Sequence, residues 1–122
     1  MKLYIVRHGE TDHNANRIAQ GHANISLNAL GKKQAQLLGE LLEVVNLDIV
    51  YSSDLKRAKQ TTEAIMKYQQ CKVVYTKKLR EANYGILDGK SYDEINAYFA
   101  TLLLKYPKKH TMDCQHRKEK RA

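Results

Sequence analysis

Apolar residues occur in two patterns along the chain, short unbroken runs and longer segments with helical spacing. Residues 3–6 form the first run and are apolar on both alternating faces, which is typical of a strand buried on both sides of a parallel sheet. Residues 47–51 and 73–75 are similar short runs. The pattern therefore predicts three strands at these positions.

Three helices are predicted between and after these strands. Leucines at helical spacing, interleaved with lysines and glutamates, predict a helix over residues 28–45. Asp54 is a suitable cap for a second helix. Ser91 and Glu94 have the form of a capping box that opens a third helix, which runs to Leu104. The buried stripe of the second helix is expected at Leu55, Ala58, Thr62, Ile65 and Met66.

This order of elements predicts an α/β fold with a parallel sheet and helices on its faces. A length of 122 residues suits one domain, and 43% hydrophobic with 28% charged residues is the balance of a soluble globular protein. No apolar run approaches the roughly 18 residues of a membrane span, and Met1 leads almost directly into the first strand, so we expect a cytoplasmic protein. Cys71 and Cys114 indicate neither a disulfide nor a zinc site.

The net charge of +8 is concentrated at the end of the chain. Residues 105–122 carry seven Lys or Arg and two Asp or Glu, which leaves +3 for residues 1–104. We therefore expect a globular domain over residues 1–106 and a basic, solvated, disordered tail over residues 107–122. A specific nucleic-acid surface is not expected, because the eight tyrosines are scattered and the basic excess lies mostly in the tail.

Candidate chemistry follows two of the predicted strands. Arg7, His8 and Gly9 come directly after the first strand, and Arg57 lies on the first turn of the helix after the second. Ligands bind at the carboxyl ends of parallel strands. Arginine presents a planar fork to phosphate oxygens, a neutral imidazole is a competent nucleophile, and glycine lets a ligand approach the backbone. One Arg-His pair is more often an ordinary surface pair, but two strand ends that converge on one crevice predict a phosphate site.

These residues belong to five motifs that occur in the order typical of one family. The chain resembles the histidine phosphatase superfamily, also called phosphoglycerate mutase-like, from Met1 to about Tyr106. The resemblance implies the family's three-layer α/β fold with a parallel sheet. The motifs are Arg7-His8-Gly9-Glu10-Thr11 with Asn14, then Gln20-Gly21, then Leu27 with Gly31 and Gln34-Ala35, then residues 51–58, and finally Leu79-Arg80-Glu81.

The resemblance also implies a role for individual residues. His8 would be the nucleophile that becomes a phosphohistidine, Arg7 and Arg57 would clamp the phosphoryl group, and Glu81 would donate the proton. This role requires a raised pKa for Glu81; the alternative is a surface carboxylate paired with Arg80. Two guanidinium groups and backbone donors can bind the transition state without a metal, so no cofactor is expected. The remaining substrate-binding residues implied are Gly9, Asn14, Gln20 and Gly21.

The motif details favour phosphomonoester hydrolysis over mutase chemistry. Gln20-Gly21 and Gln34-Ala35 stand where mutases tend toward Gly-Trp and Glu-Ala pairs, and the chain has no tryptophan. The expected partner is a small phosphate ester, although the sequence names neither the ester nor the oligomeric state. Mutase-type transfer and a non-catalytic protein that binds phosphate ligands remain the alternatives.

One family feature is missing from this sequence. Members carry a second pocket histidine in a Ser/Thr-His-Gly segment, on a strand that lies between the first two, and neither His110 nor His116 has that context. We therefore expect a fold that is incomplete at its C-terminal end, either after a frameshift or as a deliberately short binding protein. We also expect weak turnover, because removing one preorganised donor typically costs about 10²–10³ in rate.

Overall fold

The computed structural model describes residues 1–105, which fall into two units. Residues 1–89 form the first unit, and the second begins at Lys90. The tail predicted over residues 107–122, with His110 and His116, lies outside the described residues. The expected domain boundary at residue 106 therefore stays a prediction.

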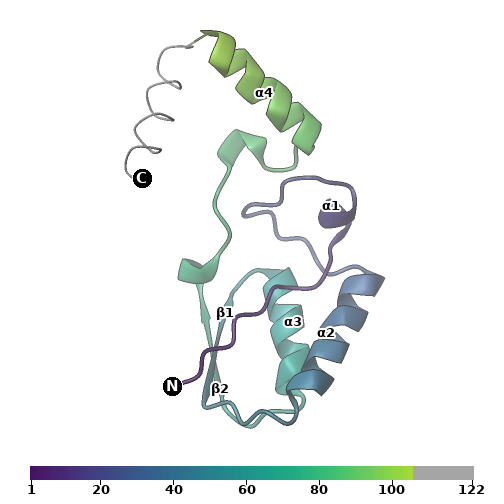
Figure 1. The fold of residues 1–122 in the computed structure, drawn as a ribbon, viewed down its shortest axis with the longest axis vertical. Coiled ribbons are helices and arrows are strands. Elements are labelled where there is room, and N and C mark those ends of the chain that lie inside the picture. Colours follow the sequence, from purple (N-terminus) through teal and green to yellow (C-terminus); the bar gives the residue numbers. More distant parts are fainter. Residues whose placement is uncertain (106–122) are drawn as a thin grey trace, which may run out of the picture. The chain divides into compact units, whose positions relative to one another are not determined.

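A short parallel sheet is the centre of the first unit. Strand β1 (Ile49–Ser53) pairs in parallel with β2 (Lys72–Thr76), with Ile49 opposite Lys72 and Ser53 opposite Thr76. Helix α3 (Lys56–Met66) connects them and packs against β1, and α2 (Ala29–Leu42) packs against α3 (Figure 1). The α/β class and the parallel pairing predicted from the sequence are confirmed.

Shorter elements complete the two units. Helix α1 (Asp12–Ala15) lies in the long segment before α2, and two 3₁₀ turns, η1 (Lys77–Leu79) and η2 (Gly85–Leu87), follow β2. In the second unit α4 (Tyr92–Lys105) begins with the predicted capping box, because Glu94 N donates to Ser91 Oγ and Ser91 N donates to Glu94 Oε2, each at 3.1 Å. No helix within residues 1–105 has the length and apolar character needed to cross a membrane.

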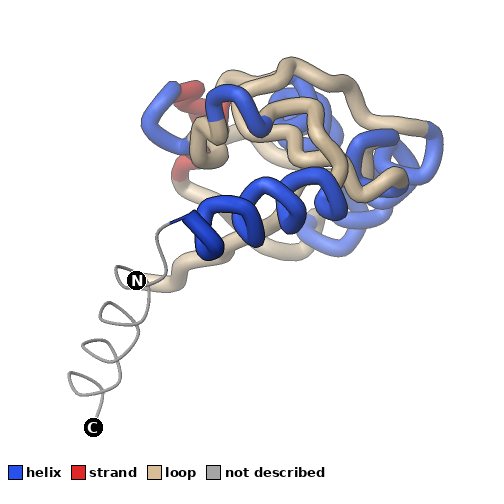
Figure 2. The backbone as a smooth tube through the Cα atoms, turned by 90° about the horizontal axis from the view of Figure 1, so that it is seen from above, coloured by secondary structure: helices blue, strands red, loops and turns tan. Residues whose placement is uncertain are grey.

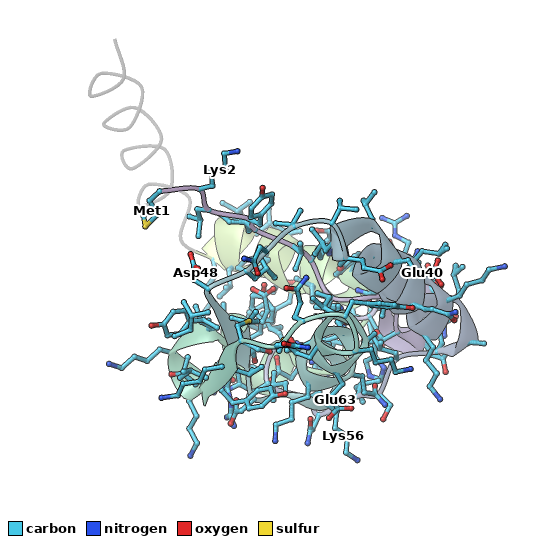
Figure 3. All side chains as sticks on the ribbon, turned by 90° about the horizontal axis from the view of Figure 1, so that it is seen from below. Met1, Lys2, Glu40, Asp48, Lys56 and Glu63 are labelled. Atoms are coloured by element: carbon cyan, nitrogen blue, oxygen red, sulfur yellow. The ribbon has the colours of Figure 1, made fainter. Side chains whose placement is uncertain are left out.

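The predicted first strand is wrong. Residues 3–6 run as a loop outside the sheet (Figure 2), and Leu3 and Ile5 are 76% and 87% exposed. Met1 and Lys2 extend outward from the same segment (Figure 3). A strand forms only where another backbone pairs with it, and in the described residues β1 pairs with β2 alone. Residues 3–6 have the apolar pattern of a strand, but within the described residues no other strand pairs with them.

Small residues and one leucine, Leu42, form the buried face of α2. Asn28 caps the helix, since its Oδ1 accepts from Gly31 N at 2.8 Å. Leu37 and Leu41 are more than half exposed. A Cβ at Gly39 would lie 2.5 Å from the Ala64 carbonyl oxygen, so α2 and α3 approach closely there. The buried residues of α2 are Gly31, Ala35, Gly39 and Leu42.

The predicted cap of α3 is also wrong. Leu55 occupies the cap position without a side-chain bond, and Asn24 Oδ1 accepts from Lys56 N at 2.8 Å instead. Asp54 is held elsewhere, because both of its carboxylate oxygens accept from Arg80 at 2.6 Å. The predicted stripe is right at Leu55, Thr62 and Ile65, while Ala58 and Met66 are only half-buried, and Arg57 and Thr61 are buried on the same helix.

Candidate active site

Two helices hold the loop that follows His8. Gly9 N donates to Thr61 Oγ1 of α3 at 3.0 Å, and Glu10 N donates to Gln34 Oε1 of α2 at 2.9 Å. The Glu10 carbonyl also accepts from Asn28 N at 3.0 Å, immediately before α2. The backbone after His8 is therefore positioned by side chains of α2 and α3.

A glycine in the loop, Gly9, and a glycine in α2, Gly31, allow the loop to lie against the helix. A Cβ on Gly9 would lie 2.3 Å from the Gly31 carbonyl oxygen, and a Cβ on Gly31 would lie 2.0 Å from the Glu10 carbonyl oxygen. Both distances are shorter than any ordinary carbon contact, so the two backbones touch directly. The close approach places His8 beside the first turn of α2.

The His8 ring is oriented by its own neighbour. His8 Nδ1 lies 2.7 Å from the Gly9 carbonyl oxygen, and a carbonyl can only accept a hydrogen bond. Nδ1 is therefore the protonated nitrogen of the neutral ring, and Nε2 carries the lone pair. This is the tautomer that a nucleophile acting through Nε2 needs.

Surrounding groups keep His8 uncharged. Burial lowers the pKa of His8 below its usual 6.5, against the opposing effect of the Gly9 hydrogen bond. The positive charges of Arg57 and Arg7 lower the pKa further, and the negative charge of Glu81 raises it. Together these effects lower the pKa of His8, so the imidazole is neutral at neutral pH and its lone pair is available.

Arg57 is buried at the start of α3, with only 2% of its surface exposed. Its Nη1 donates to the Ala23 carbonyl at 2.7 Å and its Nη2 to the Gly21 carbonyl at 2.8 Å. Burial lowers the pKa of this guanidinium, while Glu81 and Asp88 raise it. Within the described residues, two of its five N–H donors hold the loop over residues 21–23, which leaves three for another acceptor.

Arg7 and Glu81 are both exposed, and the charge of each acts on His8. The alternative pairing of Glu81 with Arg80 is wrong, because Arg80 binds Asp54 through two hydrogen bonds. The Glu81 carboxylate accepts from Ala82 N at 3.0 Å. Within residues 1–105, Glu81 is exposed and forms no ion pair.

Asn14, Gln20 and Gly21 shape the loop around α1. Asn14 Oδ1 accepts from Thr11 N at 3.0 Å, and Gln20 Oε1 accepts from the Thr11 hydroxyl. Gly21 has a φ of 50°, a conformation that favours glycine, and its carbonyl accepts from Arg57. These contacts connect Gly21 to Arg57 directly, whereas Asn14 and Gln20 reach the site through the buried Thr11.

Sequence reasoning missed two residues that support this site. Thr61 belongs to neither the predicted apolar stripe nor the predicted site. Its hydroxyl nevertheless accepts a hydrogen bond from Gly9 N and donates one to the Arg57 carbonyl at 2.8 Å. Its position four residues after Arg57 puts both on one helix face, a signal that was available. Asp88, the second residue, acts on Arg57 and lies in an irregular segment with no periodic signal.

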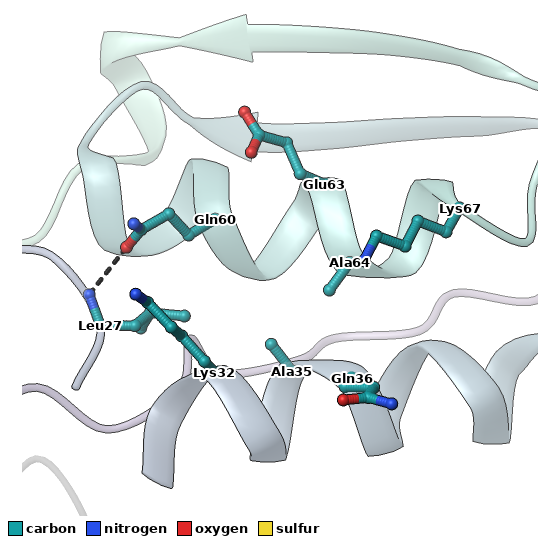
Figure 4. A pocket seen from close by; sticks show the side chains of 8 residues that line it. All are labelled: Leu27, Lys32, Ala35, Gln36, Gln60, Glu63, Ala64 and Lys67. Carbon is teal, nitrogen blue, oxygen red and sulfur yellow. Dashed lines mark hydrogen bonds between the residues drawn. The ribbon is translucent and has the colours of Figure 1, made fainter. Parts of the chain in front are cut away.

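A groove of about 290 Å³ between α2 and α3 contains none of the predicted site residues. Gln60 Oε1 accepts from Leu27 N at 2.7 Å at one end of it (Figure 4). Its lining side chains already have structural contacts or face solvent, and the His8 side of the molecule remains the candidate site. The lining residues are Leu27, Lys32, Ala35, Gln36, Gln60, Glu63, Ala64 and Lys67.

Two curated proteins are similar to this chain in sequence. A broad-specificity phosphatase of Saccharomyces cerevisiae is 41% identical over 103 residues, which cover 80% of this chain and 45% of the relative. The probable phosphoglycerate mutase GpmB of Salmonella choleraesuis is 37% identical over 95 residues, which cover 78% of this chain and 44% of the relative. The chain spans about half the length of these curated relatives.

Solved structures agree with the sequence comparisons. YhfR of Bacillus stearothermophilus matches with a TM-score of 0.70 at 36% identity, covering 75% of this chain and 45% of that protein. A mycobacterial glucosyl-3-phosphoglycerate phosphatase in complex with VO3 matches with a TM-score of 0.68 at 34% identity, covering 74% and 43%. The family model of the histidine phosphatase superfamily, branch 1, matches residues 3–120. The chain therefore belongs to the histidine phosphatase superfamily.

Proposed function

We propose that this chain is a phosphomonoester hydrolase that takes the phosphoryl group of a small phosphate ester onto His8 Nε2. The observation that carries the proposal is the 2.7 Å bond from His8 Nδ1 to the Gly9 carbonyl. That bond leaves the Nε2 lone pair as the nucleophile, and the lowered pKa of His8 keeps it unprotonated.

In the first step His8 Nε2 forms a bond to phosphorus while the bond from phosphorus to the ester oxygen breaks. Positive charge develops on the imidazole, and the Gly9 carbonyl stabilises it through the Nδ1 proton. Arg7 and Arg57 bind the three equatorial oxygens of the phosphoryl group, whose negative charge needs positioned donors. The other residues proposed to surround this group are Gly9, Asn14, Gln20 and Gly21.

Glu81 supplies the proton that the first step requires. In the proposed step the acid form of Glu81 gives its proton to the leaving alkoxide, which departs as an alcohol. The resulting carboxylate then takes a proton from water, whose oxygen attacks phosphorus and releases inorganic phosphate from His8. The exposure of Glu81 supports this role, because the group must reach both the leaving oxygen and solvent.

The similarity to the probable phosphoglycerate mutase GpmB favours one second candidate, transfer of the phosphoryl group between two carbons of a glycerate. A mutase returns the phosphoryl group to an organic acceptor, whereas a hydrolase gives it to water. Incubation with 3-phosphoglycerate separates them, because hydrolysis yields inorganic phosphate and mutase activity yields 2-phosphoglycerate.

The proposal is tested by incubating the chain with a chromogenic phosphomonoester and mapping covalent phosphate by mass spectrometry. Phosphate on His8 that is stable to base and labile to acid is expected, and His8→Ala should carry none. His13→Ala is the matched control and should label like the parent. A label that persists in His8→Ala, or a parent that binds vanadate but never acquires phosphate, contradicts the hydrolase proposal.

A further inference from the structure

Two loops that are far apart in the sequence are joined next to Arg57. Gly89 N donates to the Ala19 carbonyl at 2.9 Å. One residue earlier, the Asp88 carboxylate oxygen Oδ2 accepts from His22 N at 3.4 Å. The segment that follows η2 is therefore attached to the loop over residues 19–23, which holds the Arg57 guanidinium.

The Asp88 carboxylate is placed by its own turn and by a glycine. Its Oδ1 accepts from Tyr84 N at 3.3 Å, and Asp88 N donates to the Gly85 carbonyl at 3.1 Å. A Cβ on Gly21 would lie 2.0 Å from Asp88 Oδ1. The carboxylate thus rests against the backbone at Gly21, where any larger residue would displace it.

A single peptide group connects Asp88 to Arg57. The Gly21 carbonyl accepts from Arg57 Nη2 at 2.8 Å, and the N–H of the same peptide group, that of His22, donates to Asp88. A guanidinium at the oxygen and a carboxylate at the N–H polarise this peptide in the same direction, so that each bond strengthens the other. The Asp88 carboxylate thereby orients the peptide group, and the carbonyl of that peptide group orients the Arg57 guanidinium.

Charge supports the same connection. Arg57 is buried and pays a desolvation penalty that lowers its pKa, which nearby negative charge opposes. Glu81 and Asp88 both provide such charge. Glu81 is exposed and has the proposed proton-transfer role, whereas Asp88 is half-buried and has hydrogen bonds that fix its place.

We propose that Asp88 is a positioning residue that sets the orientation of Arg57 through the Gly21–His22 peptide group. Asp88 itself does not touch the phosphoryl group. The inference rests on the proposed function, because it assumes that Arg57 binds phosphate. Loss of the carboxylate should release the peptide, free the guanidinium to rotate, and weaken phosphate binding.

The test is a double-mutant cycle on the full chain with inorganic phosphate as the probe, measured by calorimetry. Asp88→Asn keeps the shape of the side chain and should weaken phosphate binding about 3- to 30-fold, within the range of coupled neighbours. In an Arg57→Ala background the same change should have no further effect. Asp48→Asn, an exposed carboxylate elsewhere in the first unit, is the matched control and should bind like the parent.

The outcomes separate this inference from the proposed function. Phosphate binding that survives Arg57→Ala undiminished contradicts the role of Arg57, and with it the proposed function. An Arg57→Ala chain that binds weakly, combined with an Asp88→Asn effect that is absent or equal in both backgrounds, overturns the positioning role alone. If Asp88→Asn does not fold, Asp88→Glu decides the same cycle: a loss that requires Arg57 supports the role, and an equal loss without Arg57 overturns it.

Discussion

Thr61 should contribute more to stability than its neighbour Thr62, because of these two threonines only Thr61 accepts a hydrogen bond from the loop that follows His8. Its buried hydroxyl accepts from Gly9 N at 3.0 Å and donates to the Arg57 carbonyl at 2.8 Å. Thr61→Val keeps the β-branched shape and nearly the same helix propensity. The change therefore isolates the hydroxyl and leaves the Gly9 N–H buried without an acceptor.

The size of the effect follows from these contacts. A buried donor left without a partner costs about 1–3 kcal/mol. Thr62→Val is the matched control: its equally buried hydroxyl donates to Ser52 Oγ at 2.9 Å, and Ser52 retains its own bond to the Ser53 carbonyl. Losing that one bond should cost about 0.5–1.5 kcal/mol.

The assay is urea unfolding followed by circular dichroism, combined with amide hydrogen exchange. Thr61→Val should lower the free energy of unfolding by more than Thr62→Val does, and only Thr61→Val should speed exchange of the Gly9 N–H. In a unit of 89 residues each kcal/mol corresponds to about 4–8 °C in Tm. Equal losses in the two variants, with Gly9 exchange unchanged in both, would refute the reasoning.

Three further outcomes are expected. Burial and the nearby arginines lower the pKa of His8 below 6.5, so its contribution to stability is present above pH 6.5 and is lost as the pH falls through the lowered pKa. Between pH 7.5 and 5.5 the free energy of unfolding should therefore fall more in the parent than in His8→Gln. An equal loss in both would contradict this expectation. Gly31→Ala should lower the free energy of unfolding in urea by about 1–3 kcal/mol, because the new Cβ would meet the Glu10 carbonyl. This loss is expected despite the better helix propensity of alanine. Lys33→Ala at an exposed position is the control, and a gain in stability from Gly31→Ala would contradict the expectation. Arg7→Ala and Arg57→Ala should each weaken vanadate binding by about 1.5–3 kcal/mol, as expected for hydrogen bonds to a charged group, while Arg80→Ala, whose guanidinium binds Asp54, should bind vanadate like the parent.

Local patterns predicted the elements that depend on local interactions. The helical spacing of residues 28–45 and the capping box at Ser91 need only their own neighbourhood; the box is present, and the helix forms but ends at Leu42. The parallel pairing of β1 with β2 followed from the helix between them. Residues 3–6 failed because a strand depends on a second backbone that the pattern of its own side chains does not specify.

The candidate site was predictable where it rests on residue types and hidden where it rests on backbone contacts. His8 and Arg57 stand out in the sequence as a candidate nucleophile and a candidate anion-binding group, and in the structure the charge of Arg57 acts on His8. Asp54 and Arg80 are paired with each other although they lie 26 positions apart in the sequence. Local patterns do not indicate such a pair, so the predicted cap at Asp54 and the alternative pairing of Glu81 with Arg80 both failed. Carbonyl oxygens hold the His8 and Arg57 side chains, and every residue has a carbonyl, so composition carries no sign of which one is used.

The attachment of the Gly9–Glu10 backbone to α2 and α3 separates the motion of His8 from that of the residues before it. The exposed residues 3–6 can fluctuate while the backbone after His8 stays on the two helices. Hydrogen exchange should therefore change abruptly along one short stretch of chain, with unprotected amides up to Val6 and slow exchange at Gly9 and Glu10. The rigidity of the backbone after His8 would come from helix packing rather than from a sheet.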